Sequence, residues 1–348
     1  MKIAHVVWGM KTGGVETMLV NIINEQVKTE EVRLFIINDF IDEFIVEKIS
    51  SQCKILRLNR EPGGKNPLII LKLNYWIWSY KPDIIHVHSY RISKLILGNW
   101  NIVRTIHNTG NLPDEYPQMK ALYAISDVVK EQTVKQGFSN VKTIYNGIMT
   151  GDVKTQNIVR PVNNRYKIVQ VSRLDIAQKG QDILINAINI LVNSFGISNF
   201  SLHLIGIGDS ELILRKMVGK LGLENFVFFE GVKTQEFIYN HLCDYDLFVQ
   251  PSRYEGFGIT VAEAMAAKLP VLVSDIEGPM EIIGYGKYGM YFESENVDDL
   301  AEKLRNILQG GYDYSLVEKA YQHVCNHYDV VTTAQRYIAE YKKVINTK

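Results

Sequence analysis

Short apolar runs alternate with stretches of helical spacing along this chain of 348 residues. Such alternation is typical of parallel βα units, in which each buried strand is followed by a covering helix. The apolar runs of the first half predict strands over residues 3–8, 32–37, 83–88 and 101–105. Those of the second half predict strands over residues 166–172, 201–205, 226–229, 247–250 and 270–274. The pattern therefore predicts an α/β chain with two doubly wound parallel sheets.

A polar, weakly periodic segment separates the two series of strands. Residues 150–165, TGDVKTQNIVRPVNNR, contain one proline and resemble an interdomain connection. We expect an N-terminal Rossmann-like domain over residues 1–155 and a C-terminal Rossmann-like domain over residues 156–328. The tail, residues 329–348, has helical spacing with Tyr337 and Tyr341 four residues apart. We expect this tail to form a helix that packs back on the first domain.

Composition narrows the class of protein. Lys plus Arg and Asp plus Glu both number 38, so no net charge would recruit nucleic acid. The cysteines Cys53, Cys243 and Cys325 lie far apart and outside any metal-ligand spacing, which indicates a reduced compartment. The N-terminus does not resemble a signal peptide, and no apolar run approaches the roughly 20 residues that span a bilayer. We expect a cytoplasmic protein.

The segment PSRYEGFGITVAEAMA, residues 251–266, has the most informative chemistry. A turn-forming stretch precedes a predicted helix over residues 259–268, so the amides of Ile259 and Thr260 would point outward without helical partners. A helix N-terminus of this kind is a ready site for phosphate. Glu255 lies just before it, and Glu263 follows about one turn later, where a carboxylate can bind a vicinal diol such as a ribose.

Two cations follow the first strand of the second half. Arg173 comes directly after that strand, and we expect Lys179 to begin a helix six residues later. A planar guanidinium and a compact ammonium on one loop suit a diphosphate, whose negative charge grows as a nucleoside diphosphate departs.

Glycines and histidines follow strands of the first half. Gly13 and Gly14 come after the first strand and would permit close backbone approach to a ligand, or a positive φ. His86, His88 and His107 lie at the ends of two further strands. An imidazole there can donate to a sugar hydroxyl or a phosphate, and His107 is the candidate functional residue.

One competing motif indicates a dinucleotide. Gly206 and Gly208 follow a strand, and Glu230 ends the next strand 24 residues after Gly206, where a ribose-binding acid is expected. However, Glu211 occupies the third glycine position, where its bulk and charge would crowd a pyrophosphate. An NAD-dependent oxidoreductase that uses the Gly206 loop therefore remains the alternative function.

Together these segments resemble glycosyltransferase family 4. The resemblance rests on SRLDIAQKG, on LIGIGDSELILRKMVGKLGLENFVFFEGV, on DLFVQPSRYEGFGITVAEAMAAKLPVLVSD with its E-x7-E pair, and on the N-terminal GGVE, PDIIHVHS and TIHN. It implies the GT-B fold and transfer of a sugar from a nucleotide donor with retention of anomeric configuration, without a metal or other cofactor.

The resemblance also implies roles for residues at matching positions. Arg173 and Lys179 would clamp the diphosphate, and Glu263 would hold the ribose. Glu255, with the Phe257 and Gly258 backbone, would hold the donor sugar, and Gly13 and Gly14 would approach the diphosphate. The catalytic set is then His107, Glu255, Arg173 and Lys179, and Gly231 and Val232 would contact the base. One position departs from the pattern, because Lys268 stands where the family often has glycine.

We therefore expect a retaining hexosyl- or N-acetylhexosaminyltransferase that uses a UDP-linked sugar in cell-surface polysaccharide synthesis. Its acceptor would be a glycan, by resemblance lipid-linked at the inner membrane face. A non-catalytic nucleotide-sugar binding subunit is a second alternative. Residues 67–80, PLIILKLNYWIWSY, mix aromatics with nearby lysines, as helices at membrane interfaces do. A helix at this position must also cover the sheet, and the favoured interpretation is that its Leu and Trp residues are core.

Overall fold

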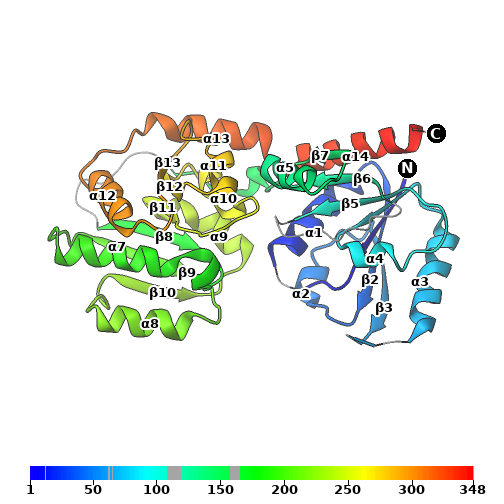
Figure 1. The fold of residues 1–348 in the computed structure, drawn as a ribbon, viewed down its shortest axis with the longest axis horizontal. Helices are drawn as coiled ribbons and strands as arrows, with labels where there is room; N and C mark the ends of the chain where they lie inside the picture. Colours follow the sequence, from blue (N-terminus) through cyan, green and yellow to red (C-terminus); the bar gives the residue numbers. More distant parts are fainter. Residues whose placement is uncertain (12, 62, 65, 108–118, 157–164, 348) are drawn as a thin grey trace. The chain divides into compact units, whose positions relative to one another are not determined.

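The computed structural model describes residues 1–11, 13–61, 63–64, 66–107, 119–156 and 165–347. The α/β prediction is confirmed, because the strands form two sheets of seven and six strands in which all neighbours are parallel. The chain divides into unit 1, Met1–Met149 with Tyr328–Lys348, and unit 2, Thr150–His327. Each unit is described by itself below (Figure 1).

The sheet of unit 1 has the order β3-β2-β1-β4-β5-β6-β7. Its strands are β1 (Lys2–Val7), β2 (Glu31–Asn38), β3 (Lys54–Arg60), β4 (Ile84–Val87), β5 (Ile102–Ile106), β6 (Met119–Ala124) and β7 (Val141–Thr143). Its helices are α1 (Gly14–Gln26), α2 (Glu43–Val46), α3 (Pro67–Tyr80), α4 (Tyr90–Ser93), α5 (Asp127–Lys135) and α14 (Val330–Asn346). The order reverses between β1 and β4, where ligands bind in doubly wound sheets.

The sheet of unit 2 has the order β10-β9-β8-β11-β12-β13. Its strands are β8 (Tyr166–Val171), β9 (Phe200–Ile205), β10 (Val227–Gly231), β11 (Leu247–Gln250), β12 (Val271–Ser274) and β13 (Met290–Phe292). Its helices are α6 (Ile176–Lys179), α7 (Gln181–Asn193), α8 (Glu211–Lys220), α9 (Gln235–His241), α10 (Ile259–Ala266), α11 (Glu277–Ile282), α12 (Val297–Leu308) and α13 (Ser315–His327), with 3₁₀ turns at Thr150–Asp152 and Leu242–Asp244.

All nine predicted strands exist, with ends displaced by at most two residues. Four further strands, β3, β6, β7 and β13, were not predicted. β7 and β13 are edge strands of three residues, too short to show a period. β3 is an edge strand with charges in its sequence, KILRLNR, and β6 contains helix-forming Ala and Leu.

Both faces of the unit 1 sheet are buried, as parallel sheets require. Ile3 and Val7 of β1 pack in one core cluster with residues of α1 and α14, whereas Ala4 and Val6 pack in a second cluster with residues of α3. Alternation along the strand therefore places His5 on the α1 and α14 face. The tail helix, red in Figure 1, lies in unit 1 and packs against α1.

Candidate active site

The loop before α10 and the loop before α7 meet in unit 2. The Lys179 ammonium donates to the Glu255 carboxylate, and the two side chains are only 15% and 16% exposed. Two residues predicted from separate motifs are thus brought together. The local prediction for Lys179 was wrong, because it ends the one-turn helix α6 and does not begin the next helix.

Backbone packing explains why these loops meet. Gly180 has φ +65°, and a Cβ on it would lie 1.9 Å from the Pro251 carbonyl oxygen, so only glycine fits. The Arg253 amide donates to the Gln178 carbonyl oxygen at 2.9 Å. The Arg253 guanidinium binds both oxygens of Asp182 at 2.9 Å, a bidentate pairing that fixes its geometry. The loop with Lys179 is therefore held rigidly against the loop with Glu255.

The start of α10 has the geometry expected of an anion site. Gly258 is its N-cap with φ +106°, and α10 begins at Ile259, so the first amides have no acceptor within the helix. Phe257 is 2% exposed, and its ring therefore belongs to the core. Any ligand contact from Phe257 must come from its backbone. The helix ends at Ala266, two residues before the predicted end.

Glu263 is the most deeply buried carboxyl of the predicted site. It is 6% exposed, and burial raises the pKa of its carboxyl to about 8. Its oxygens accept hydrogen bonds from Gln235 and Tyr239 of α9. This helix follows the turn of Gly231 and Val232, in which Gly231 has φ +69° and Val232 is exposed. Glu263 thus contacts α9, the helix that follows the predicted base-binding turn.

Arg173 lies in a different environment from Lys179. Its guanidinium donates to Asp175 at 2.8 Å and to Gln178 at 3.1 Å, and its side chain is 63% exposed. An exposed pair of this kind contributes little to stability. The guanidinium can exchange Asp175 for a phosphate at small cost, whereas Lys179 is fixed by its buried partner.

The Gly206 loop is explained by packing. A Cβ on Gly206 would lie 2.0 Å from the Ser172 carbonyl oxygen, and one on Gly208 would lie 2.3 Å from the Leu174 carbonyl oxygen. These glycines let the backbone approach the loop that contains Arg173. Glu230, the ribose-binding acid of the dinucleotide alternative, instead accepts from the His203 ring at 2.7 Å. The glycine pair and Glu230, the two features that favoured NAD binding, thus have structural roles.

Lys268, the departure from the family pattern, adopts the backbone conformation that glycine favours. Its φ is +57°, so the left-handed turn after α10 forms without glycine. The Lys268 ammonium lies 2.7 Å from the Glu318 carboxylate and 4.6 Å from the centre of the Tyr321 ring. These contacts with α13 offset the backbone strain, typically about 1 kcal/mol for a non-glycine residue.

In unit 1, the glycine pair begins α1. Gly14 is its first residue, and Gly13 is the N-cap with φ −173°. The expectation of positive φ was wrong for Gly13, which is extended. A Cβ on Gly13 would lie 2.7 Å from a Glu16 carboxylate oxygen, at the end of a side chain that can move away. The exposed start of a 13-residue helix thus follows β1 at the position where the strand order reverses.

The histidines of unit 1 form a buried network. The structure brings His88 and His107 together, with His88 Nδ1 3.3 Å from His107 Nε2. Sequence reasoning missed His5, whose Nδ1 lies 3.4 Å from His88 Nε2. His5 pairs with His86 in the register of β1 and β4. If this register had been assumed from the sequence, it would have placed His5 beside the other histidines.

His86 has a structural environment. Its Nδ1 lies 2.6 Å from the Tyr341 hydroxyl and its Nε2 lies 2.8 Å from the Thr105 hydroxyl, so both ring nitrogens are satisfied. Thr105 in turn bonds the Tyr337 hydroxyl at 2.8 Å. These bonds fix α14 to the sheet. Nitrogens of His5, His86 and His88 lie within 4.8 Å of one another, but a metal there would have to displace bonds that His86 already makes.

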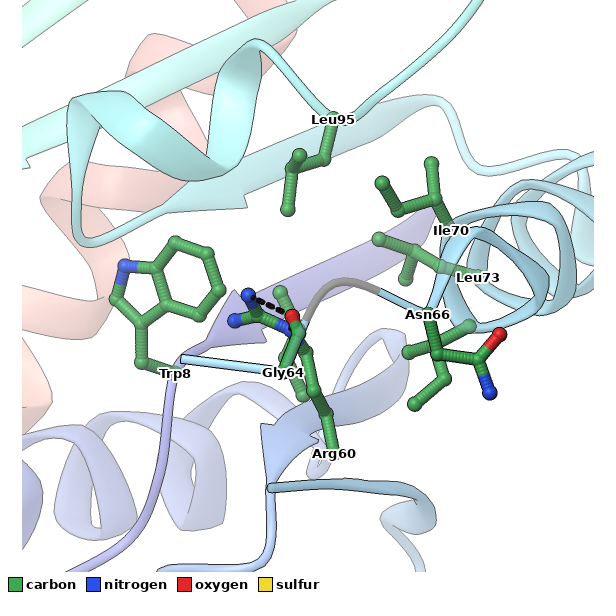
Figure 2. Close-up of a pocket in the computed structure, with 9 residues that line it drawn as sticks. Trp8, Arg60, Gly64, Asn66, Ile70, Leu73 and Leu95 are labelled. Carbon is green, nitrogen blue, oxygen red and sulfur yellow. Dashed lines mark hydrogen bonds between the residues drawn. The ribbon is translucent and has the colours of Figure 1, made fainter. Parts of the chain in front are cut away.

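A small pocket lies at the carboxyl ends of β1, β2 and β3. It has a volume of about 140 Å³, close to the roughly 150 Å³ of a cavity that accepts benzene. Figure 2 shows the Arg60 guanidinium between Trp8 and the side chains of α3, bonded to the Gly64 carbonyl oxygen. Most of the wall is apolar, from Trp8, Ile37, Ile69, Ile70, Leu73 and Leu95.

The outer face of α3 is apolar and exposed. Leu68, Leu71, Tyr75 and Trp78 are each 58% to 66% exposed, whereas Leu73, Ile77 and Tyr80 are buried. The core interpretation is thus right for one face of α3 and wrong for the other. No helix in the described part of the chain combines the length and apolar character that a bilayer-spanning segment needs.

Sequence comparisons decide the family. The profile of the glycosyl transferases group 1 matches residues 154–323, and that of Glycosyltransferase Family 4 matches residues 12–151. The chain belongs to glycosyltransferase family 4. Its two parallel sheets form the GT-B fold of that family.

Three similar proteins extend this assignment. A poly(ribitol-phosphate) alpha-N-acetylglucosaminyltransferase of Staphylococcus aureus is 31% identical over 157 residues, which are 45% of this chain and 31% of that protein. The match thus covers less than a third of that relative. A glycosyltransferase of Rickettsia africae superposes with a TM-score of 0.83 at 21% identity, over 100% of this chain and 99% of the other. An Anabaena protein solved with UDP and glucose gives 0.79 at 22% identity, over 99% of each chain.

Proposed function

We propose that this family 4 glycosyltransferase transfers a hexosyl or N-acetylhexosaminyl group from a UDP-linked sugar, with retention and without a metal. The observation that carries the proposal is the partly buried Lys179–Glu255 pair beside the open start of α10. A cation and unpartnered helix amides within one unit can stabilise a departing diphosphate, the task that a metal performs in other transferases. The UDP and glucose bound by the Anabaena protein support the choice of donor.

The proposed roles follow the environments of the residues. Lys179 and the amides of Ile259 and Thr260 bind the diphosphate, and Arg173 exchanges Asp175 for a phosphate oxygen. Glu263 binds the ribose, since its carboxyl already accepts two hydrogen bonds that hydroxyl groups can replace. Glu255 binds a hydroxyl of the donor sugar through the oxygen that Lys179 leaves unpaired. Gly231 and Val232 contact the base, with Phe257 and Gly258 contributing backbone atoms.

Residues of unit 1 have proposed roles of their own. The backbone of Gly13 and Gly14 approaches the diphosphate at the start of α1, and His107 steadies the reacting sugar. The leaving phosphate takes the proton of the acceptor hydroxyl, on the same face of the sugar from which it departs. No carboxylate needs to form a covalent adduct in this route.

We further propose that the acceptor is a lipid-linked glycan of a cell-surface polysaccharide, reached at the inner face of a membrane. The exposed outer face of α3 supports this, because aromatic and aliphatic side chains with flanking lysines suit an interface. Residues 62–82 contain Lys65, Lys72 and Lys81 and no acidic residue, which favours an anionic bilayer. The poly(ribitol-phosphate) acceptor named for the Staphylococcus relative supports a polymeric acceptor.

The test is a donor screen that measures UDP release with and without membrane lipid extracts as acceptors. We expect release from one UDP-sugar that rises when lipid-linked glycans are added. The control is Lys216→Ala, an exposed lysine on α8, which should match the wild type, whereas Lys179→Ala should lose release. UDP binding with no turnover for any donor would support a non-catalytic subunit and contradict the proposal.

A further inference from the structure

A continuous line of hydrogen bonds joins α1 to the end of β5 in unit 1. The side-chain amide oxygen of Gln26, Oε1, lies 2.8 Å from His5 Nε2, and His5 Nδ1 lies 3.4 Å from His88 Nε2. His88 Nδ1 then lies 3.3 Å from His107 Nε2. His5 and His88 thus each point Nε2 toward the Gln26 end of the line and Nδ1 toward the His107 end. His107 points its Nε2 toward His88.

The rings of this line are neutral. Burial lowers the pKa of His5 and of His107 to about 4, and the pKa of His88 is well below its usual value, first through burial and then through His107, His5 and Arg104. A neutral imidazole donates from one nitrogen and accepts at the other. The direction of one bond in the line therefore decides the direction of all of them.

Gln26 decides that direction, because its side-chain oxygen Oε1 can only accept. His5 must then donate from Nε2, which leaves its Nδ1 as an acceptor for His88 Nε2. The same step repeats from His88 to His107. The line as a whole leaves His107 with its proton on Nε2 and a lone pair on Nδ1.

The far end of the line has no partner. His107 Nδ1 is buried, and the described residues supply no hydrogen bond to it. A buried acceptor without a partner destabilises the fold, so its persistence points to a ligand. His86 shows the contrast, because hydroxyl groups satisfy both of its nitrogens. His107 also lies at the carboxyl edge of the sheet, where ligands of doubly wound folds bind.

We propose that Gln26, His5 and His88 are positioning residues that hold His107 in the Nε2–H tautomer, so that its Nδ1 accepts a hydrogen bond from a hydroxyl of a bound sugar. The inference rests on the proposed function for the identity of the ligand as a sugar. The assignment of the tautomer does not rest on the proposed function, because the hydrogen bonds that set it are all within the protein. Gln26 and His5 would act on the reaction only through His88 and His107.

The tautomer is tested by nitrogen-15 NMR of histidine-labelled protein, because protonated and unprotonated ring nitrogens differ widely in chemical shift. In the wild type we expect Nδ1 of His107 to be unprotonated and Nε2 to be protonated. Gln26→Leu removes the fixed acceptor, so His107 should become a mixture of the two tautomers. The signals of His203, which bonds Glu230 in unit 2, should stay unchanged. A proton on Nδ1 in the wild type, or an unchanged His107 in Gln26→Leu, would overturn the proposal.

Kinetics test the consequence and identify the sugar. His88→Leu should raise the KM of one sugar substrate about 10-fold, equal to about 1.4 kcal/mol and near the value of one hydrogen bond. A raised donor KM assigns the hydroxyl to the donor, and a raised acceptor KM assigns it to the acceptor. His88→Gln should restore most of the loss, since an amide can both accept from His107 and donate to His5.

Thr133→Val is the matched control, because it removes a buried hydroxyl that bonds the Val129 carbonyl oxygen outside the line. It should leave both KM values unchanged. Equal losses in His88→Leu and His88→Gln, with a lowered melting temperature in both, would show that His88 is only structural and overturn the proposal. If no donor is turned over at all, the proposed function fails, but the NMR result still decides the tautomer.

Discussion

The two units bury polar groups by different means. Unit 2 pairs charges at its strand ends, with Lys179 bonded to Glu255 and Arg253 bonded to Asp182. Unit 1 buries neutral rings, because desolvation lowers the pKa values of His5 and His107 to about 4. A fixed cation interacts strongly with a charged diphosphate, whereas a neutral acceptor suits a hydroxyl group and avoids the cost of a buried charge. The difference teaches that Lys179 and His107 suit different ligand groups, a charged phosphate for Lys179 and a neutral hydroxyl for His107.

Among these tests of the comparison, removing the Lys179 ammonium should have the largest effect on activity. Lys179→Ala should lower turnover on the order of 10²- to 10³-fold, because it takes away a charge that interacts most strongly as the diphosphate departs. Steady-state UDP release measures this, with Lys216→Ala as the matched control. Part of the loss could come from an unpaired Glu255 carboxylate, so Lys179→Ala/Glu255→Gln is needed as well. Turnover near that of the wild type in the single variant would exclude Lys179 from the reaction.

The neutral histidines predict how stability depends on pH. The pKa of His5 is lower in the folded chain than in the unfolded one, so the unfolded state binds more protons between pH 6.5 and about 4. The free energy of unfolding should therefore fall as pH falls through this window, by on the order of 2 to 3 kcal/mol from His5. Denaturant titrations at several pH values measure it. His5→Gln should flatten the slope, and an unchanged slope would mean that His5 is not buried as a neutral ring.

Glu263 sharpens the comparison from within unit 2, because its carboxyl is buried and, among the described residues, its hydrogen bonds come from Gln235 and Tyr239 and not from a cation. Glu263→Gln should raise the donor KM about 10-fold with little change in kcat, since a ribose contact is made in both the ground and the transition state. Calorimetry with UDP gives the matching loss of affinity. UDP affinity equal to that of the wild type would show that Glu263 does not bind the ribose.

The outer face of α3 should give the smallest effect. Trp78→Ser and Leu71→Ser should each reduce binding to anionic vesicles a few-fold, because each removes one apolar side chain from an extended contact. Vesicle co-sedimentation at low and high salt measures it. Leu212→Ser removes an equally exposed leucine from α8 in unit 2 and should have no effect. Loss of binding in the Leu212 variant as well would mean that the contact is not specific to α3.

Sequence could predict the parts of this molecule that depend on local pattern. The strand and helix alternation predicted the fold class, and the segment from Glu255 to Glu263 predicted the first residue of α10, Ile259, correctly. Contacts between distant segments could not be read in that way. The Lys179–Glu255 pair depends on Gly180 approaching Pro251, and the line from Gln26 to His107 depends on the register of β1 against β4. Register and loop packing are set by the whole sheet, which no single segment encodes.

The outer face of α3 shows the same limit. A helix next to a sheet must bury one stripe, but apolar residues of PLIILKLNYWIWSY lie on both the buried and the exposed side of α3. Sequence alone therefore favoured a core role for its Trp residues. In the structure, Trp78 is exposed, whereas Ile77 beside it is fully buried.

The stereochemistry of the product tests the central claim most directly. A time course by proton NMR with the UDP-α-sugar identified in the donor screen would show the anomeric coupling of the glycan product as it forms. Departure of the diphosphate held by Lys179 and attack on the same face predict an α-linked product. A β-linked product, or a glycosyl adduct trapped on Glu255, would contradict the account.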